Sequence, residues 1–250
     1  MRRVGGAVVG ALLLVVFTTA CSSSFGFPDG STEQGRDIRN LWIVFVVAAI
    51  GVAGLVYGLI AWSLVRYRRR AGDDPDALGR QIHANVPIEV VYTAIPVAIV
   101  VVLFAMSFRT EQRVTDLADD PATTIEATAF AWGWRFEYPE EDVTIVSPPS
   151  SPTEPGPEIV LPVGAPTRIV LRANDVVHAF WVPDFNFKRD AIPGRTTVFD
   201  LTPLETGTFR GVCSEFCGLN HAFMTFSVRV VDLGEFDAWV ASAADEEAEA

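Results

Sequence analysis

The sequence predicts a two-helix transmembrane hairpin followed by an all-β domain of the sandwich or barrel type. Residues 41–65 and 90–108 contain no charged side chain and are dominated by apolar ones. Beyond them, between Thr123 and Val231, short β-branched and aromatic runs alternate with Pro, Gly and Asp clusters, a pattern typical of all-β domains. A mean hydropathy of +0.30 over 250 residues agrees with membrane segments attached to one folded domain.

Residues 1–21 are predicted to be a secretory signal peptide. Arg2 and Arg3 precede an apolar run, and small residues lead to Cys21. Cys21 is a candidate for lipoprotein processing, so the mature chain is expected to begin near it. The alternative, a retained transmembrane span over residues 4–20, is disfavoured because spanning takes about 20 apolar residues. Residues 22–40 then form an exterior N-terminal segment.

The two uncharged stretches are each long enough to cross a bilayer. Pro96 falls within the second stretch and is expected to kink that helix. The loop between them, residues 66–89, contains five arginines, and loops rich in arginine stay on the cytoplasmic side. Both the N-terminus and residues 109–250 are therefore expected on the exterior face of a bacterial plasma membrane, in agreement with the signal peptide.

The exterior part, with its folded domain predicted over residues 120–240, is strongly acidic. Residues 111–250 contain 24 Asp and Glu against nine Lys and Arg. This charge disfavours nucleic acid and favours a basic protein partner, although ordinary solubility also explains it. A Pro- and Ser-rich loop over residues 147–157, a short helix over 233–241 and a disordered acidic tail over 241–250 are expected. Strands are predicted at residues 124–131, 167–171, 196–201, 208–212 and 224–231.

Four soft or borderline metal donors lie within twelve residues: Cys213, Cys217, His221 and Met224, with His178 some 35 residues upstream. Thiolates and imidazoles also suit zinc, but a thioether is typical of electron-transfer copper sites. Two thiolates on one loop can each bridge two metal ions. The competing interpretation is a Cys213–Cys217 disulfide, which an oxidising exterior compartment permits.

Several of these segments resemble cytochrome c oxidase subunit II. CSEFCGLNHAFM (213–224), HAFWVP (178–183) and RDAIPGR (189–195) resemble its copper-binding domain, and IHANVPIEVVYTAIP (82–96) resembles the approach to its second membrane helix. The resemblance implies a cupredoxin-like Greek-key barrel with a binuclear CuA centre. That centre would accept electrons from cytochrome c and pass them to haem-containing subunit I, where oxygen is reduced to water with proton pumping.

The resemblance assigns expected roles to individual residues of this sequence. The resemblance implies that two copper ions are bridged by both cysteines, capped by both histidines and contacted weakly by a thioether and a backbone carbonyl. The implied copper ligands are His178, Cys213, the carbonyl of Glu215, Cys217, His221 and Met224. The Glu215 carboxylate would bind a magnesium ion shared with subunit I.

The resemblance also implies how electrons and protons arrive. Trp132 matches the residue where electrons enter from cytochrome c, although Gly133 replaces the family's middle aromatic residue. On sequence alone, Trp132 and Trp134 would share one face of a strand and pack in the core. Glu137 and Asp175 match docking carboxylates for cytochrome c. Glu89 is a candidate for the entrance of a proton channel. Other oxidase subunits and membrane lipid are the remaining partners.

Other protein classes fit less well. A quinol oxidase subunit has the same architecture but characteristically lacks the copper ligands. A membrane-tethered copper carrier needs exposed, labile ligands and no tryptophan for electron transfer. A nitrous oxide reductase needs a large catalytic domain that 250 residues cannot hold. Because the chain has no CxxCH motif, the electron donor is expected to be a separate protein or another subunit.

Overall fold

The computed structural model describes residues 27–70, 72–74, 79, 81–147 and 156–248. The signal peptide with Cys21, and most of the Pro- and Ser-rich loop, lie outside these residues. The chain divides into two compact units. Among the described residues, one unit contains residues 27–39 together with those from Val114 onward, and the other contains those within Asn40–Arg113.

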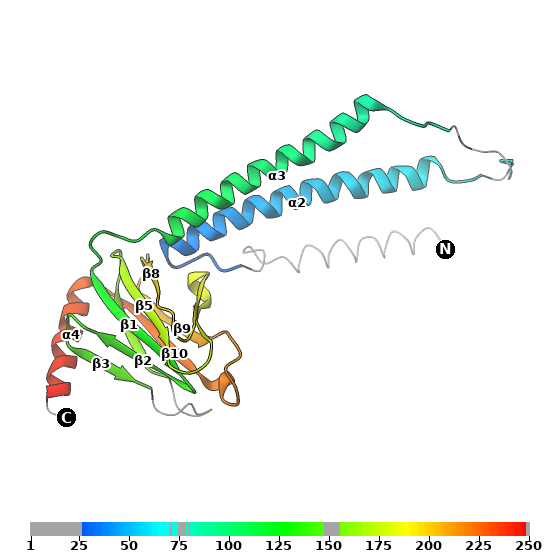
Figure 1. Ribbon diagram of the computed structural model, residues 1–250. Helices are drawn as coiled ribbons and strands as arrows, with labels where there is room; N and C mark the ends of the chain where they lie inside the picture. Colours follow the sequence, from blue (N-terminus) through cyan, green and yellow to red (C-terminus); the bar gives the residue numbers. More distant parts are fainter. Residues whose placement is uncertain (1–26, 71, 75–78, 80, 148–155, 249–250) are drawn as a thin grey trace, which may run out of the picture. The chain divides into compact units, whose positions relative to one another are not determined.

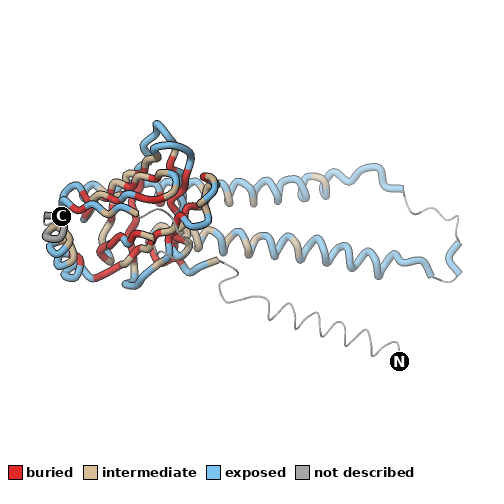
Figure 2. The backbone as a smooth tube through the Cα atoms, turned by 90° about the horizontal axis from the view of Figure 1, so that it is seen from below, coloured by how far each residue is buried: buried red, intermediate tan, exposed pale blue. Residues whose placement is uncertain are grey.

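Two long helices make up the second unit and extend beyond it at the ends. The chain runs along α2 (Glu33–Arg66) and returns along α3 (Val86–Thr115) (Figure 1). Both helices are long and apolar enough to cross a membrane, and exposed large apolar residues occur along them. Most of both helices is coloured as exposed in Figure 2. They contain the predicted spans 41–65 and 90–108, and α3 continues through Pro96.

The first unit is a sandwich of two five-stranded sheets, as predicted for an all-β domain. In spatial order, the first sheet contains β3 (Val143–Val146), β2 (Gly133–Tyr138), β1 (Thr123–Phe130), β5 (Thr167–Ala173) and β8 (Thr197–Leu201). The second contains β4 (Glu158–Pro162), β10 (Thr225–Val231), β9 (Gly207–Cys213), β6 (His178–Val182) and β7 (Phe187–Ala191). Side chains on β1 alternate between buried and half-buried, which places one face of the strand against the core.

Five of these strands, β1, β5, β8, β9 and β10, match the predicted runs to within two residues. The expectation of a disordered tail was wrong, because α4 (Leu233–Ala248) continues through most of it. Alanine and glutamate favour helix, and the helix begins by packing Phe236 into the core. The short strands β3, β4, β6 and β7 had no prediction.

Aromatic rings fill the space between the two sheets. Trp134 is fully buried and packs edge-on against Phe180 and Phe226, with centroids 6.1 and 5.3 Å apart. These rings come from different sheets, so their packing joins the two layers into one core. In Figure 2 the buried part of the chain gathers within this sandwich.

The first turns of α2 belong to the sandwich unit. Thr32 forms an isolated bridge with Pro203, and its Oγ1 caps the helix by accepting a hydrogen bond from the Gly35 amide at 3.0 Å. A Cβ atom at Gly35 would lie 2.3 Å from the carbonyl oxygen of Phe185. Only glycine therefore allows this turn to pack against η1 (Pro183–Phe185), the short 3-10 helix that follows β6.

A second attachment joins the segment after α3 to the sandwich. Asp200 on β8 is 3% exposed and accepts two hydrogen bonds from the guanidinium of Arg168, each 2.9 Å long. The same carboxylate accepts the Ala118 amide at 2.6 Å, and Arg168 donates to the Ala118 carbonyl. One buried ion pair thus holds the chain between α3 and β1 against β5 and β8.

Candidate metal centre

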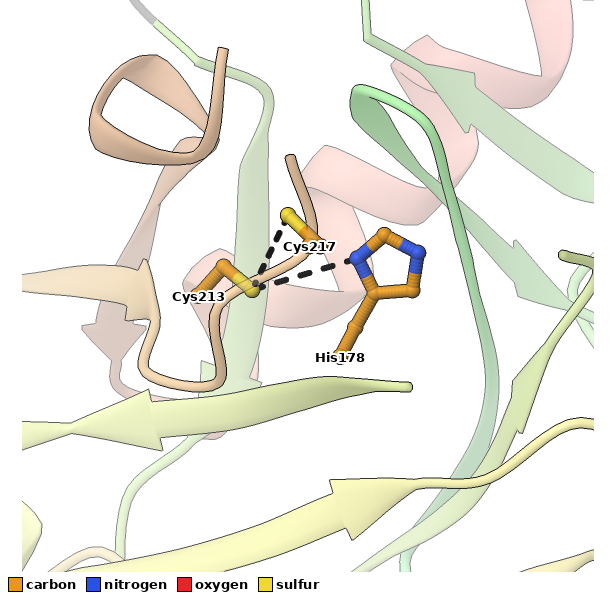
Figure 3. Close-up of side chains that lie close together, drawn as sticks. All are labelled: His178, Cys213 and Cys217. Carbon is orange, nitrogen blue, oxygen red and sulfur yellow. Dashed lines mark hydrogen bonds between the residues drawn. The ribbon is translucent and has the colours of Figure 1, made fainter. Parts of the chain in front are cut away.

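The predicted donors converge at one end of the second sheet. Cys213 ends β9, and Met224 immediately precedes β10, so the intervening loop is held at both ends by paired strands. His178 begins β6, which pairs with β9 through Phe180 and Cys213. The pairing brings His178 beside the loop although the two are 35 residues apart in sequence (Figure 3).

Each thiol has its own imidazole. The Cys213 sulfur is 3.9 Å from Nδ1 of His178, and the Cys217 sulfur is 3.6 Å from Nδ1 of His221. The two sulfurs are 3.8 Å apart, and the Met224 sulfur is 3.8 Å from that of Cys217. His178, Cys213, Cys217 and Met224 are all buried, whereas His221, in the 3-10 helix η2 (His221–Phe223), is half-buried.

These separations fit ligands that share a metal ion. Around a tetrahedral ion with metal–sulfur bonds of about 2.3 Å and metal–nitrogen bonds of about 2.0 Å, neighbouring ligand atoms lie about 3.5–3.8 Å apart. The donor set of two thiols, two imidazoles and a thioether selects a soft metal, because a hard cation would prefer oxygen ligands. The site therefore fits copper, and zinc would leave the buried Met224 sulfur unused.

The two thiols differ in acidity. Burial acts to raise the pKa of Cys213, but its hydrogen bond with His178 and those with backbone groups outweigh burial and lower that pKa. Burial and the neighbouring Cys213 charge both raise the pKa of Cys217. Burial acts to lower the pKa of His178, whereas its hydrogen bonds with Cys213 and Asp175 raise it overall. The His178 imidazole therefore favours the thiolate form of Cys213.

The disulfide alternative does not agree with this geometry. Both Cys213 and Cys217 are free, and the 3.8 Å between their sulfurs far exceeds a disulfide bond of about 2.05 Å.

The backbone and side chain of Glu215 are directed to different partners. The carbonyl oxygen of Glu215 lies 3.3 Å from the Cys213 sulfur, at the metal-binding side of the loop. Its carboxylate is 45% exposed and lies 3.5 Å from the ammonium of Lys188, the only lysine in the chain. Lys188 in turn lies 3.4 Å from Asp190 on β7.

Trp132 lies in the turn between β1 and β2, so it does not share a strand face with Trp134 as the sequence suggested. β2 begins at Gly133, and Trp134 is fully buried in the core, whereas Trp132 is half-buried and packs against the core from the turn. The Trp132 indole N–H donates to the carbonyl of Cys217 at 3.0 Å. Gly218 has a φ of +120°, and a Cβ there would lie 3.1 Å from the indole ring, so glycine lets the ring approach the loop. Sequence reasoning had assigned no role to Gly218.

The other predicted residues are distributed over three elements. Glu137 on β2 is 37% exposed and lies 3.9 Å from Arg135. Glu89 lies in the first turn of α3, where its carboxylate accepts the amide of Asn85 at 2.9 Å. Asp175, in the loop before β6, contacts the ring of His178. That contact was missed, although the three-residue spacing of Asp175 and His178 could have indicated it.

Together these features define a class of protein: a membrane-anchored cupredoxin-like domain with a metal centre of thiolates, imidazoles and a thioether. Two family descriptions match the chain, "Cytochrome C oxidase subunit II, periplasmic domain" at residues 123–231 and "Cytochrome C oxidase subunit II, transmembrane domain" at residues 20–110. The chain belongs to the cytochrome c oxidase subunit II family, and so forms part of an oxidoreductase complex.

Individual proteins of this family are similar to the chain over much of its length. Cytochrome c oxidase subunit 2 of Mycobacterium tuberculosis is 33% identical, with 94% of this chain aligned to 79% of that protein. The probable subunit 2 of Streptomyces avermitilis is 34% identical, with coverage of 92% and 83%. Among solved structures, the periplasmic domain of subunit II from Bradyrhizobium japonicum is 36% identical, covering 52% of this chain and 99% of that one with a TM-score of 0.47.

Proposed function

We propose that this chain accepts electrons from cytochrome c at a binuclear copper centre and passes them to haem-containing subunit I. There, oxygen would be reduced to water with proton pumping. In this proposal the copper domain lies on the exterior face of a bacterial plasma membrane. The observation that carries it is the cluster of two thiols 3.8 Å apart, each beside a separate imidazole, with a thioether and a backbone carbonyl close by, because a single four-coordinate ion would leave part of this donor set unused.

A pair of copper ions bridged by Cys213 and Cys217 would share one electron, which keeps the change in geometry on reduction small. His178 and His221 would each bind one ion, and Met224 and the Glu215 carbonyl would be weak outer ligands. The chain's own task is to hold these donors in place. The paired strands β6, β9 and β10 do so, because they fix both ends of the loop and the position of His178.

Trp132 is the proposed point where electrons arrive. Its indole ring packs on Gly218 and its N–H donates to the Cys217 carbonyl, so a single hydrogen bond joins the ring to a bridging cysteine. The net acidic charge of residues 111–250 suits a basic donor protein, and such electrostatic steering falls with added salt. Glu137 and Asp175 are the proposed docking carboxylates, and each exposed charge alone would contribute little.

Two further roles concern subunit I. The Glu215 carboxylate is proposed to bind magnesium at the contact with that subunit, since it lies away from the sulfur cluster and half exposed. Glu89 is proposed to mark the entrance of a proton channel. In this chain its carboxylate caps α3 by accepting the Asn85 amide, so the first turn of the helix fixes the position of that acid.

The proposal is tested by loading the full-length, detergent-solubilised chain with copper and measuring metal content and the EPR spectrum. Two coppers per chain sharing one unpaired electron in the oxidised state are expected. The matched control is Met106→Leu, a methionine on α3 outside the site, compared with Met224→Leu inside it. Only the second substitution should change the spectrum. A single copper, or a spectrum from isolated copper ions, would contradict the binuclear centre.

A further inference from the structure

The carboxylate of Asp175 uses both of its oxygens within the domain. Oδ1 lies 2.8 Å from Nε2 of His178 and accepts the Val176 amide at 2.7 Å. Oδ2 accepts the amide of Ala131 at 2.6 Å. Asp175 is 37% exposed, so it faces solvent on one side while contacting the metal site on the other. A residue that served only to attract a partner protein would not need these three contacts.

The contact with His178 fixes which ring nitrogen is free. His178 is fully buried, so the proton on its ring must be hydrogen-bonded inside the domain. A carboxylate can only accept, and therefore in the neutral imidazole, the form that binds a metal, it holds the proton on Nε2 and leaves Nδ1 unprotonated. Nδ1 is the nitrogen directed at the Cys213 sulfur (Figure 3). Metal-binding histidines commonly need such a partner to set the orientation of the ring.

The contact with Ala131 reaches the turn that carries Trp132. Ala131 directly precedes Trp132, whose indole donates to the Cys217 carbonyl. The contacts therefore form a closed circuit from His178 through Asp175 and the Ala131–Trp132 turn to Cys217, and from there through Cys213 back to His178. A single side chain links the proposed electron-accepting ring to a metal ligand.

We propose that Asp175 is a positioning residue of the metal centre: it orients the His178 imidazole and anchors the turn that holds Trp132 against the Cys217 loop. This inference rests on the proposed copper centre and adds a role that docking alone does not explain. The negative charge also strengthens His178 as a donor and favours the more positive, oxidised state of the bound metal.

The test compares Asp175→Asn with Glu137→Gln in the full-length, copper-loaded chain. Each substitution removes one negative charge from a carboxylate that is 37% exposed. Asp175→Asn should shift the redox equilibrium constant about tenfold toward the reduced state, a rise of about 59 mV for one electron. It should also weaken copper binding by about ten- to a hundredfold. Glu137→Gln should leave both the potential and the EPR spectrum at wild-type values.

A second variant, Asp175→Glu, keeps the charge but displaces the carboxylate by one methylene. Positioning predicts an altered EPR spectrum with an unchanged rate of association with cytochrome c, whereas docking alone predicts wild-type behaviour in both. Wild-type potential and spectra in both Asp175 variants would overturn the inference. The failure of unsubstituted protein to bind two coppers would instead overturn the proposed function, so the two results are distinguishable.

Discussion

Asp200→Asn is expected to be among the most destabilising polar substitutions in the sandwich. The amide that replaces the carboxylate keeps one oxygen, which can still accept the Nε–H of Arg168. The other oxygen becomes an NH2 group, which faces two donors: Nη2 of Arg168, 2.9 Å away, and the Ala118 amide, 2.6 Å away. Two charge-assisted hydrogen bonds are therefore lost, and Arg168 loses its counter-charge.

The expected loss of stability follows from the burial of the two partners. Breaking one side of a buried ion pair costs about 3–5 kcal/mol. Asp200 is 3% exposed, but the side chain of Arg168 is 22% exposed and can gain water after the change. The low end, about 3 kcal/mol, therefore applies. For a domain of roughly 150 residues, this lowers Tm by about 6–12 °C.

The assay is thermal unfolding of the full-length chain in detergent, followed by near-UV circular dichroism of the buried aromatic core. The control is Glu235→Gln, which removes a carboxylate that is 59% exposed and pairs with Arg229. Exposed ion pairs contribute about 0–1 kcal/mol to stability, so the Tm of the control should be close to that of the wild type. If Asp200→Asn has the same Tm as the control, the ion pair does not hold the segment after α3 and the reasoning fails.

Three further predictions test other contacts. Gly35→Ala should lower the unfolding free energy of the sandwich by about 1–3 kcal/mol because the new methyl overlaps the Phe185 carbonyl; unchanged chemical denaturation would refute this. Burial raises the pKa of Tyr138, so stability should be complete below about pH 10 and fall above it as unfolded tyrosine ionises. Tyr138→Phe should flatten that alkaline slope in denaturation titrations. Trp132→Phe should slow reduction by cytochrome c in stopped-flow measurements while preserving the copper spectrum. Unchanged kinetics would exclude Trp132 as the point where electrons enter.

The hydrophobic pattern and the composition of the sequence were sufficient to predict much of the fold. The uncharged spans 41–65 and 90–108 lie inside α2 and α3, and the β-branched runs became β1, β5, β8, β9 and β10. The strands without a prediction are short or atypical. For example, β7 has the sequence FKRDA, whose charged residues give no apolar run. It pairs with β6 through contacts that depend on tertiary structure rather than on local propensity.

The cluster of thiol, imidazole and thioether side chains could be predicted because their chemistry is unusual in so short a segment. What the sequence could not supply was the set of contacts around them. The indole bond from Trp132 to the Cys217 carbonyl spans 85 residues, and the Ala131 amide meets Asp175 across 44 residues. The resemblance implied that Asp175 serves a partner protein, and the structure adds a contact of its carboxylate with His178. Long-range pairing of strands decides such contacts.

The location of the donors between β9 and β10 makes the centre a modular part of the domain. Five of the six proposed ligating positions fall within residues 213–224, and the core rings Trp134, Phe180 and Phe226 lie outside that segment. Replacement of this one loop is therefore expected to change or remove the proposed metal ligands while the aromatic core keeps its packing. A transplanted loop would have to meet two fixed side chains of the scaffold: His178, beside the Cys213 sulfur, and Trp132, whose indole donates to the Cys217 carbonyl and packs on Gly218.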